Sequence, residues 1–289
     1  MAVGSGLPHL GGYPFEVRYS DGSLLRARAA ADGAADAYVY FSRLFAVEPD
    51  IALVVANEAD WPGSWSPYGL PFFRDDAGEI RPGVVVMPAR GGDFWVAMAQ
   101  DLRDASPCGY ARLLATYSDG AGGLNLQPFF DLITIHELGH AFEVIGDLRL
   151  PTFWLSEIFV NLALHAFVAT RLPSSLPTLE VLPAVGAASR KLAARMRAEG
   201  YSTLEELQAH YPGRGESISP LNYVWFQYRW QRVAATVFNA DGEDGLVRFW
   251  NSFHATDRVN STEATAASLA PLLKTEVSVT LGRAVQNWR

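Results

Sequence analysis

The pattern of apolar and polar positions predicts a mixed sheet-and-helix part before residue 120. Apolar and polar side chains alternate from Phe15 to Tyr19, which predicts a strand, and residues 51–55 form an apolar run typical of a buried strand. Between them, residues 30–46 return apolar side chains at helical spacing. Residues 61–73 are crowded with proline, glycine and aromatic side chains, which favours a structured loop.

A further strand is predicted at residues 81–88, which have proline near both ends. Proline lacks an N–H donor and is tolerated at a sheet edge, so an edge position is expected, with an internal strand as the open alternative. Residues 94–116 then show helical spacing around a proline, and the glycine-rich residues 119–123 interrupt the pattern. We place a boundary at this interruption.

The remainder of the chain is predicted to be mainly helical. Two strongly apolar helices are expected at about residues 128–145 and 151–171. The later helical segments are 185–199, 203–210, 221–239, 243–254 and 262–274. The expected fold class is therefore α+β, with an N-terminal lobe at residues 1–125 and a helical lobe at residues 126–289.

Composition and charge narrow the classes of partner. The chain has 289 residues, of which 49% are hydrophobic, so a substantial core is possible. Its formal net charge of −8 argues against nucleic acid or an anionic membrane as the main partner. Cys108 is the only cysteine, which excludes an internal disulfide. Neither a signal peptide nor a membrane-spanning run is evident, so a cytoplasmic location is expected.

The candidate chemistry lies in the motif H-E-x-x-H at His136, Glu137 and His140, within the first of the two apolar helices. Residues four apart on a helix share one face, so the two imidazoles can bind one metal ion. Zn²⁺ takes neutral histidine nitrogens, and a catalytic zinc site has three protein ligands and a water molecule. Glu137 is then placed to accept a proton from that water molecule.

Two carboxylates near the motif are weighed as the third ligand, Asp147 and Glu157. The metzincin pattern requires glycine and histidine where this chain has Glu143 and Gly146, so that class is excluded. Asp147 follows directly at the expected helix end and ranks second. Glu157 is the stronger candidate because it lies within the second apolar helix, where a buried carboxylate needs a ligand or partner.

The segment HELGH, followed by W-L-S-E-I-F-V-N with Glu157 seventeen residues after His140, resembles the gluzincin zinc metallopeptidases. The resemblance covers about thirty residues. It implies a zincin-like fold with the zinc site between the two lobes. It also implies His136, His140 and Glu157 as the zinc ligands and Glu137 as the general base. Asn161 takes the place of an aspartate that orients a ligand histidine in thermolysin-like members.

The same resemblance implies a substrate-binding strand and a donor to the oxyanion. In gluzincins an edge strand beside the zinc helix pairs with extended peptide, which makes residues 81–88 the candidate. A tyrosine or histidine of the helical lobe donates a hydrogen bond to the oxyanion. Tyr223 is the candidate, with Tyr228 and His254 as substitutes, whereas His165 is expected to be a core histidine or to support a ligand.

The function expected from these residues is hydrolysis of a peptide bond by metal-activated water, with a peptide or protein as the substrate. A non-peptide amide hydrolase and a non-catalytic binding or regulatory protein are the alternatives. The chain shows no counterpart of the Gly-Ala-Met-Glu-Asn stretch that holds a free N-terminus in aminopeptidase-like members, which favours an endopeptidase or a small specialised hydrolase. The motif also accepts Co²⁺, Mn²⁺ or Ni²⁺, and oligomeric state is not encoded in it.

Overall fold

The computed structural model describes residues 6–62, 66, 68–74, 80–90, 92–210, 220–254 and 264–288. Contacts within the chain divide it into two compact units, residues 1–95 with 126–148 and residues 96–125 with 149–289. Residues 126–148 thus belong to the unit that contains the sheet, whereas the sequence predicts them in the helical lobe. The mixed α+β character, with an N-terminal sheet and a helical C-terminal region, is confirmed.

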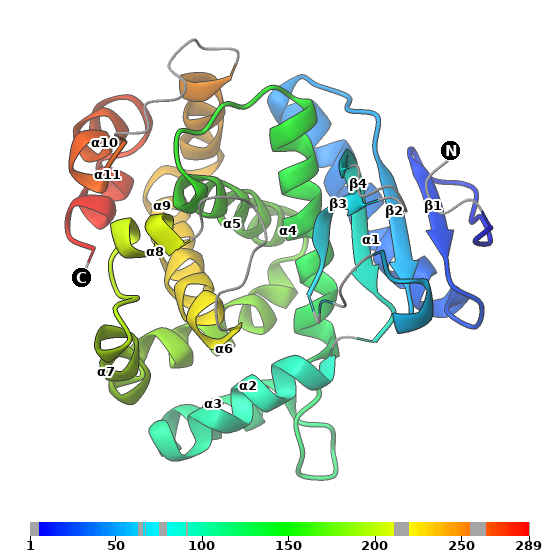
Figure 1. The fold of residues 1–289 in the computed structure, drawn as a ribbon, viewed down its shortest axis with the longest axis horizontal. Coiled ribbons are helices and arrows are strands. Elements are labelled where there is room, and N and C mark those ends of the chain that lie inside the picture. The colour runs from blue at the N-terminus through cyan, green and yellow to red at the C-terminus, as the bar shows by residue number, and fades with distance from the viewer. Residues whose placement is uncertain are drawn as a thin grey trace. The chain divides into compact units, whose positions relative to one another are not determined.

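The first unit is built on a four-stranded sheet with the order β1-β2-β4-β3 (Figure 1). Its strands are β1 (Glu16–Tyr19), β2 (Ala52–Ala56), β3 (Leu70–Arg74) and β4 (Ile80–Pro88). Strands β1, β2 and β4 are parallel, and β3 runs antiparallel to β4. All residues of β2 are buried, as expected for an apolar run with neighbours on both sides.

Strand β4 confirms the prediction of a strand at residues 81–88, but the predicted edge position is wrong. β4 pairs with β2 on one side and with β3 on the other. The sheet accommodates its prolines because Pro82 lies opposite Phe72, beside an irregularity in the β3 register, and Pro88 ends the strand. β3 is an edge strand, and all of it except its last residue lies within residues 61–73, which were predicted to form a loop.

Two helices cover this sheet, α1 (Leu24–Phe45) and α4 (Gln127–Ile145). α4 packs against α1, β3 and β4. The side chain of Phe142 on α4 contacts the rings of Tyr38, Phe41 and Phe45 on α1, with centroid separations of 5.5, 5.5 and 6.2 Å. This aromatic cluster fixes α4 in the first unit. α2 (Gly92–Ala105) begins in the first unit and ends in the second.

The second unit consists of helices. They are α3 (Pro107–Tyr117), α5 (Phe153–Arg171), α6 (Leu176–Ala188), α7 (Arg190–Ala198), α8 (Leu204–His210), α9 (Pro220–Phe253), α10 (Ala266–Leu272) and α11 (Val279–Gln286). α5 packs along α9 (Figure 1). α9 has non-helical backbone angles at Gly242, with φ of 60°, which matches the break predicted at residues 239–242.

Helix α5 is apolar along nearly its whole length, and residues 154–168 are buried. By length and composition it is the one helix among the described residues that could cross a membrane, and 83% of its apolar window is buried inside the structure. Such burial is typical of a core helix. The polar residues of α5 therefore need partners within the protein.

Candidate metal centre

Helix α4 places His136 and His140 one turn apart on the same face. Pro128 lies in the first turn of the helix, where its missing N–H is not needed, and apolar residues bury the segment from Phe129 onward. The two imidazole rings lie 5.0 Å apart between centroids, and both side chains are buried. The helical spacing read from the sequence thus produces a buried histidine pair.

Helix α5 supplies the acidic side chain. Thr152 caps the helix by accepting a hydrogen bond from the Leu155 main-chain N–H, and Glu157 follows in the second turn. Glu157 is 2% exposed. Burial of a carboxylate in an apolar helix is unfavourable unless charged or hydrogen-bonding groups surround it. Two residues of α9 hydrogen-bond to this carboxylate: Gln227 and Tyr223 donate to its two oxygens at 2.6 and 3.3 Å.

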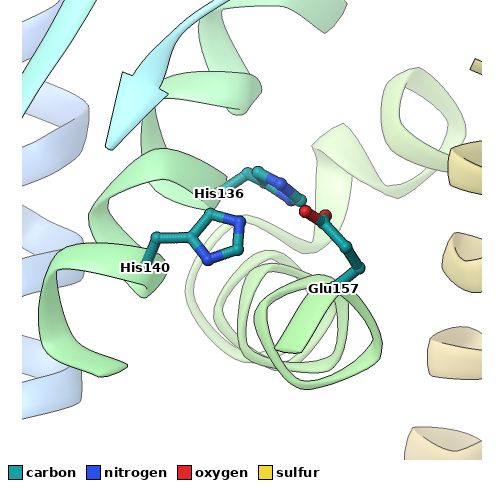
Figure 2. Close-up of side chains that lie close together, drawn as sticks. All are labelled: His136, His140 and Glu157. Atoms are coloured by element: carbon teal, nitrogen blue, oxygen red, sulfur yellow. The ribbon is translucent and has the colours of Figure 1, made fainter. Parts of the chain in front are cut away.

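His136, His140 and Glu157 together form a buried group that could hold a metal ion. One ligand atom from each residue lies within 4.8 Å of the other two. Figure 2 shows the carboxylate of Glu157 pointing toward the imidazoles. Ligands bound to one tetrahedral zinc ion lie roughly 3.4 Å apart, so small side-chain rotations bring these atoms to ligating distance. Two imidazoles and one carboxylate are a donor set that zinc takes in catalytic sites.

Among the residues that the structure describes, neither Asp147 nor Glu143 belongs to this group. Asp147 has φ of 56° and occupies the left-handed position after α4. The main-chain N–H of Leu148 donates to the carbonyl of Glu143 at 2.9 Å, which closes a Schellman-type turn. Gly146 ends the helix as predicted, but with φ of −80°, so Asp147 provides the left-handed residue. The structure therefore favours Glu157 as the third candidate ligand.

Glu143, and not Asn161, contacts a candidate ligand histidine among the described residues. Its Oε2 atom lies 3.0 Å from Nδ1 of His140, and its side chain is buried. A carboxylate that accepts the Nδ1 proton leaves the Nε2 lone pair of His140 for a metal ion. Asn161 instead donates to the main-chain oxygen of Glu157 and to Oε1 of Gln227, at 2.8 and 2.9 Å. The expectation that Asn161 orients a histidine is therefore not met by these contacts.

Glu137 is also buried, and the main chain before β3 lies directly against it. A Cβ atom at Gly69 would collide with Cγ of Glu137 and with Sδ of Met87. Glycine therefore permits the close approach of the two segments. Gly69 lies in the proline, glycine and aromatic stretch predicted as a loop. The sequence gives no signal of this approach, because Gly69 is one of several glycine and proline residues in that stretch.

Tyr223, the candidate oxyanion donor, lies beside Glu157, while its two predicted substitutes have other surroundings. Tyr223 is half-buried, and its ring lies over Phe153 at a centroid separation of 6.4 Å. Tyr228 is buried, its hydroxyl has no hydrogen-bond partner among the described residues, and burial raises its pKa. His254 stacks on Trp250 at 5.1 Å. Among the three, only Tyr223 has a hydrogen bond to the candidate ligands.

His165 is a core histidine, in agreement with one of its two predicted roles. It is 1% exposed, and burial lowers its pKa to about 4. Its Nδ1 atom lies 3.3 Å from Nε2 of Gln231, and its Nε2 atom lies 3.8 Å from the Glu180 carboxylate. The ring is therefore neutral at neutral pH, two turns beyond Glu157 on the same helix.

Comparisons with known proteins leave the metal centre as the main guide to function. No protein-family model matches the chain, and no curated protein matches it significantly.

Proposed function

We propose that this protein is a zinc-dependent peptidase of the gluzincin type. The observation behind the proposal is the buried group of His136, His140 and Glu157, with the buried Glu137 following His136 on the same helix. A structural zinc site is usually closed by four protein ligands, whereas three ligands leave a position for water or substrate. Three ligands and an adjacent base are thus the donor set of a hydrolase.

In the proposed hydrolysis, Glu137, Glu143 and Tyr223 each have a separate role. A bound zinc ion would lower the pKa of a water molecule toward about 7 and polarise the substrate carbonyl. Glu137 accepts a proton from the attacking water and delivers it to the leaving amine. Glu143 orients His140 through its Nδ1 atom, 3.0 Å away. The hydroxyl of Tyr223 donates to Oε1 of Glu157 at 3.3 Å, and its single hydrogen would turn from that oxygen to the oxyanion that develops on the carbonyl.

The edge strand β3 supports an extended peptide as the substrate. β3 pairs with β4 on one side, and no described strand pairs with its other side. An extended chain can add to such an edge through main-chain hydrogen bonds. Gly69 immediately precedes β3 and lies against Glu137, so a peptide added to β3 would run close to the general base. The substrate-binding strand proposed here is β3, in place of residues 81–88.

Metal analysis combined with peptide cleavage tests the proposal. We expect about one zinc ion per wild-type chain, retained in Glu137→Gln and lost in Glu157→Ala, because only the latter removes a ligand. Cleavage of a peptide library is expected for the wild type and should disappear in Glu137→Gln. Zinc binding unaffected by Glu157→Ala would refute the ligand set. Bound zinc with no peptide cleaved would refute the peptidase and leave the non-peptide amidase or the non-catalytic protein.

A further inference from the structure

Helix α9 holds both oxygens of the Glu157 carboxylate. Nε2 of Gln227 donates to Oε2 at 2.6 Å, and the hydroxyl of Tyr223 donates to Oε1 at 3.3 Å. Nε2 of Gln227 also donates to the hydroxyl oxygen of Tyr223 at 2.7 Å. A side-chain amide has two N–H groups, so Gln227 uses one on each partner. Gln227 and Tyr223 are one turn apart and act on Glu157 as a pair.

Asn161 fixes which end of the Gln227 amide faces the carboxylate. Its Nδ2 atom donates to the main-chain oxygen of Glu157 at 2.8 Å and to Oε1 of Gln227 at 2.9 Å. A main-chain carbonyl only accepts hydrogen bonds, so the NH₂ group of Asn161 must face it. The same NH₂ group then requires an acceptor on Gln227. The Gln227 oxygen is thereby directed to Asn161 and its nitrogen to Glu157.

These hydrogen bonds form a closed ring that begins and ends at Glu157. Asn161 connects the main-chain oxygen of Glu157 to the Gln227 oxygen, and the Gln227 nitrogen returns to the Glu157 carboxylate. The reverse orientation of Gln227 would set its oxygen against the carboxylate and its NH₂ against that of Asn161. Both contacts would be repulsive in a buried site, where electrostatic interactions are strong. The network therefore admits one orientation of the Gln227 amide, with its nitrogen on the Glu157 carboxylate.

We propose that Gln227, oriented by Asn161, is the positioning residue that presents Glu157 to the metal ion through its Oε1 atom. This inference rests on the metal site of the proposed function. A carboxylate oxygen in a short, charge-assisted hydrogen bond is committed to its donor, and here that oxygen is Oε2. Oε1 has the longer hydrogen bond of the two and is directed to the ion. Hydrogen bonds to ligating carboxylates are known to tune metal affinity.

An aspartate at position 161 would reverse the polarity at nearly constant shape. Its carboxylate could donate neither to the Glu157 carbonyl nor to the Gln227 oxygen, and Gln227 would turn its NH₂ group toward the new charge. The Glu157 carboxylate would then lose the donor that lies 2.6 Å from its Oε2 atom. Asn161→Asp thus tests the orientation of Gln227 without changing Gln227 or any ligand.

The competing explanation is that Gln227 only helps α5 to pack against α9. Gln231 provides a matched control, because it is a glutamine one turn further along α9, is buried, and contacts α5 at His165 instead of Glu157. A packing role would make Gln227→Met and Gln231→Met alike. A positioning role would separate them in metal affinity.

The experiment measures zinc affinity by competition with a chromophoric chelator, and the unfolding of each metal-free variant in urea. We expect Gln227→Met and Asn161→Asp each to weaken zinc binding by about 10-fold to 100-fold, with Gln231→Met within about twofold of the wild type. The double variant of positions 161 and 227 should bind zinc no more weakly than the weaker single variant, because both changes break the same bond. If Gln227→Met does not fold, Asn161→Asp tests that bond.

The outcomes separate this inference from the proposed function. A wild type that binds no zinc would overturn both. If the wild type binds zinc and both Gln227→Met and Asn161→Asp bind it as tightly as the wild type, the positioning role alone is overturned. Equal losses in Gln227→Met and Gln231→Met would also overturn it, in favour of helix packing.

Discussion

Replacing Glu143 with glutamine tests how the protein prepares His140 for a metal ion. Oε2 of Glu143 lies 3.0 Å from Nδ1 of His140, with side-chain exposures of 2% and 7%. Glutamine keeps the shape and one acceptor oxygen but removes the charge. Hydrogen bonds to charged groups contribute about 1.5–3 kcal/mol and neutral ones about 0.5–1.5 kcal/mol, so the expected loss is about 1–2 kcal/mol. That difference corresponds to zinc binding weakened by about 5-fold to 30-fold.

Chelator competition at pH 7.5 measures this loss directly, and Asp131→Asn on the same helix serves as the control. Asp131 is partly exposed and is bonded to Arg26 and Gln127, both at 2.8 Å, so its change should leave zinc affinity unaltered. Equal zinc affinities for Glu143→Gln and the wild type would refute the reasoning, because the carboxylate would then make no contribution to the basicity or orientation of the imidazole.

Three further changes test other parts of the structure. Gly69→Ala forces a Cβ atom against Glu137, so turnover should fall about tenfold or more while zinc affinity is kept; unchanged turnover would contradict the close approach. Burial lowers the pKa of His165 to about 4 from 6.5, so the unfolded chain binds the proton more readily and stability falls as pH drops from 6.5 toward 4. The full effect is about 3 kcal/mol, and in urea unfolding His165→Leu should lose that pH slope; a slope equal to that of the wild type would exclude His165 as its source. Main-chain N–H groups at the start of α8 lower the pKa of Glu206, so Glu206→Gln should lose about 0.5–1 kcal/mol of unfolding free energy at pH 7, with the difference vanishing as pH falls through that lowered pKa; a difference that persists in acid would rule out the carboxylate.

Apolar spacing located the elements whose own side chains form the core. α4 was expected at residues 128–145, and the observed helix differs only in beginning at Gln127. The prediction is close because the apolar residues of α4 are the ones that the helix buries. The segment 185–199 instead contains the end of α6 (Leu176–Ala188) and the whole of α7 (Arg190–Ala198). The side chain of Ser189 accepts the Leu192 N–H and starts α7, a capping signal that was present in the sequence. α11 (Val279–Gln286) was not predicted, although Ser278 caps it in the same way.

Strand β3 shows where local pattern fails. Leu70 to Arg74 contains a proline and follows a glycine, and both residues favour a loop by propensity. The segment is a strand because β4 supplies the hydrogen-bonding partner, and pairing overrides propensity at an edge. Because β3 was not predicted, residues 81–88 were expected at the edge of the sheet. The number of neighbours of a strand depends on segments elsewhere in the chain.

The candidate site shows the same division between local and distant information. His136, His140 and Glu143 share one face of one helix, so their proximity follows from spacing alone. Glu157 was recognised as a polar residue that an apolar helix tolerates only with a partner. That reasoning applies equally to Gln227, which stands among aromatic residues of α9, and it would have marked Gln227 as a residue in need of a partner.

The identity of that partner required the packing of α5 along α9, because Gln227 lies 70 residues from Glu157. The same packing gives Asn161 its partners. Glu143 lies 3.0 Å from His140 on α4, whereas Asn161 donates to the main-chain oxygen of Glu157 and to Oε1 of Gln227. Both of these acceptors require a donor at position 161, and a carboxylate there would supply none. The amide of Asn161 thus directs the NH₂ group of Gln227 toward the Glu157 carboxylate, an arrangement that no local pattern in the sequence contains.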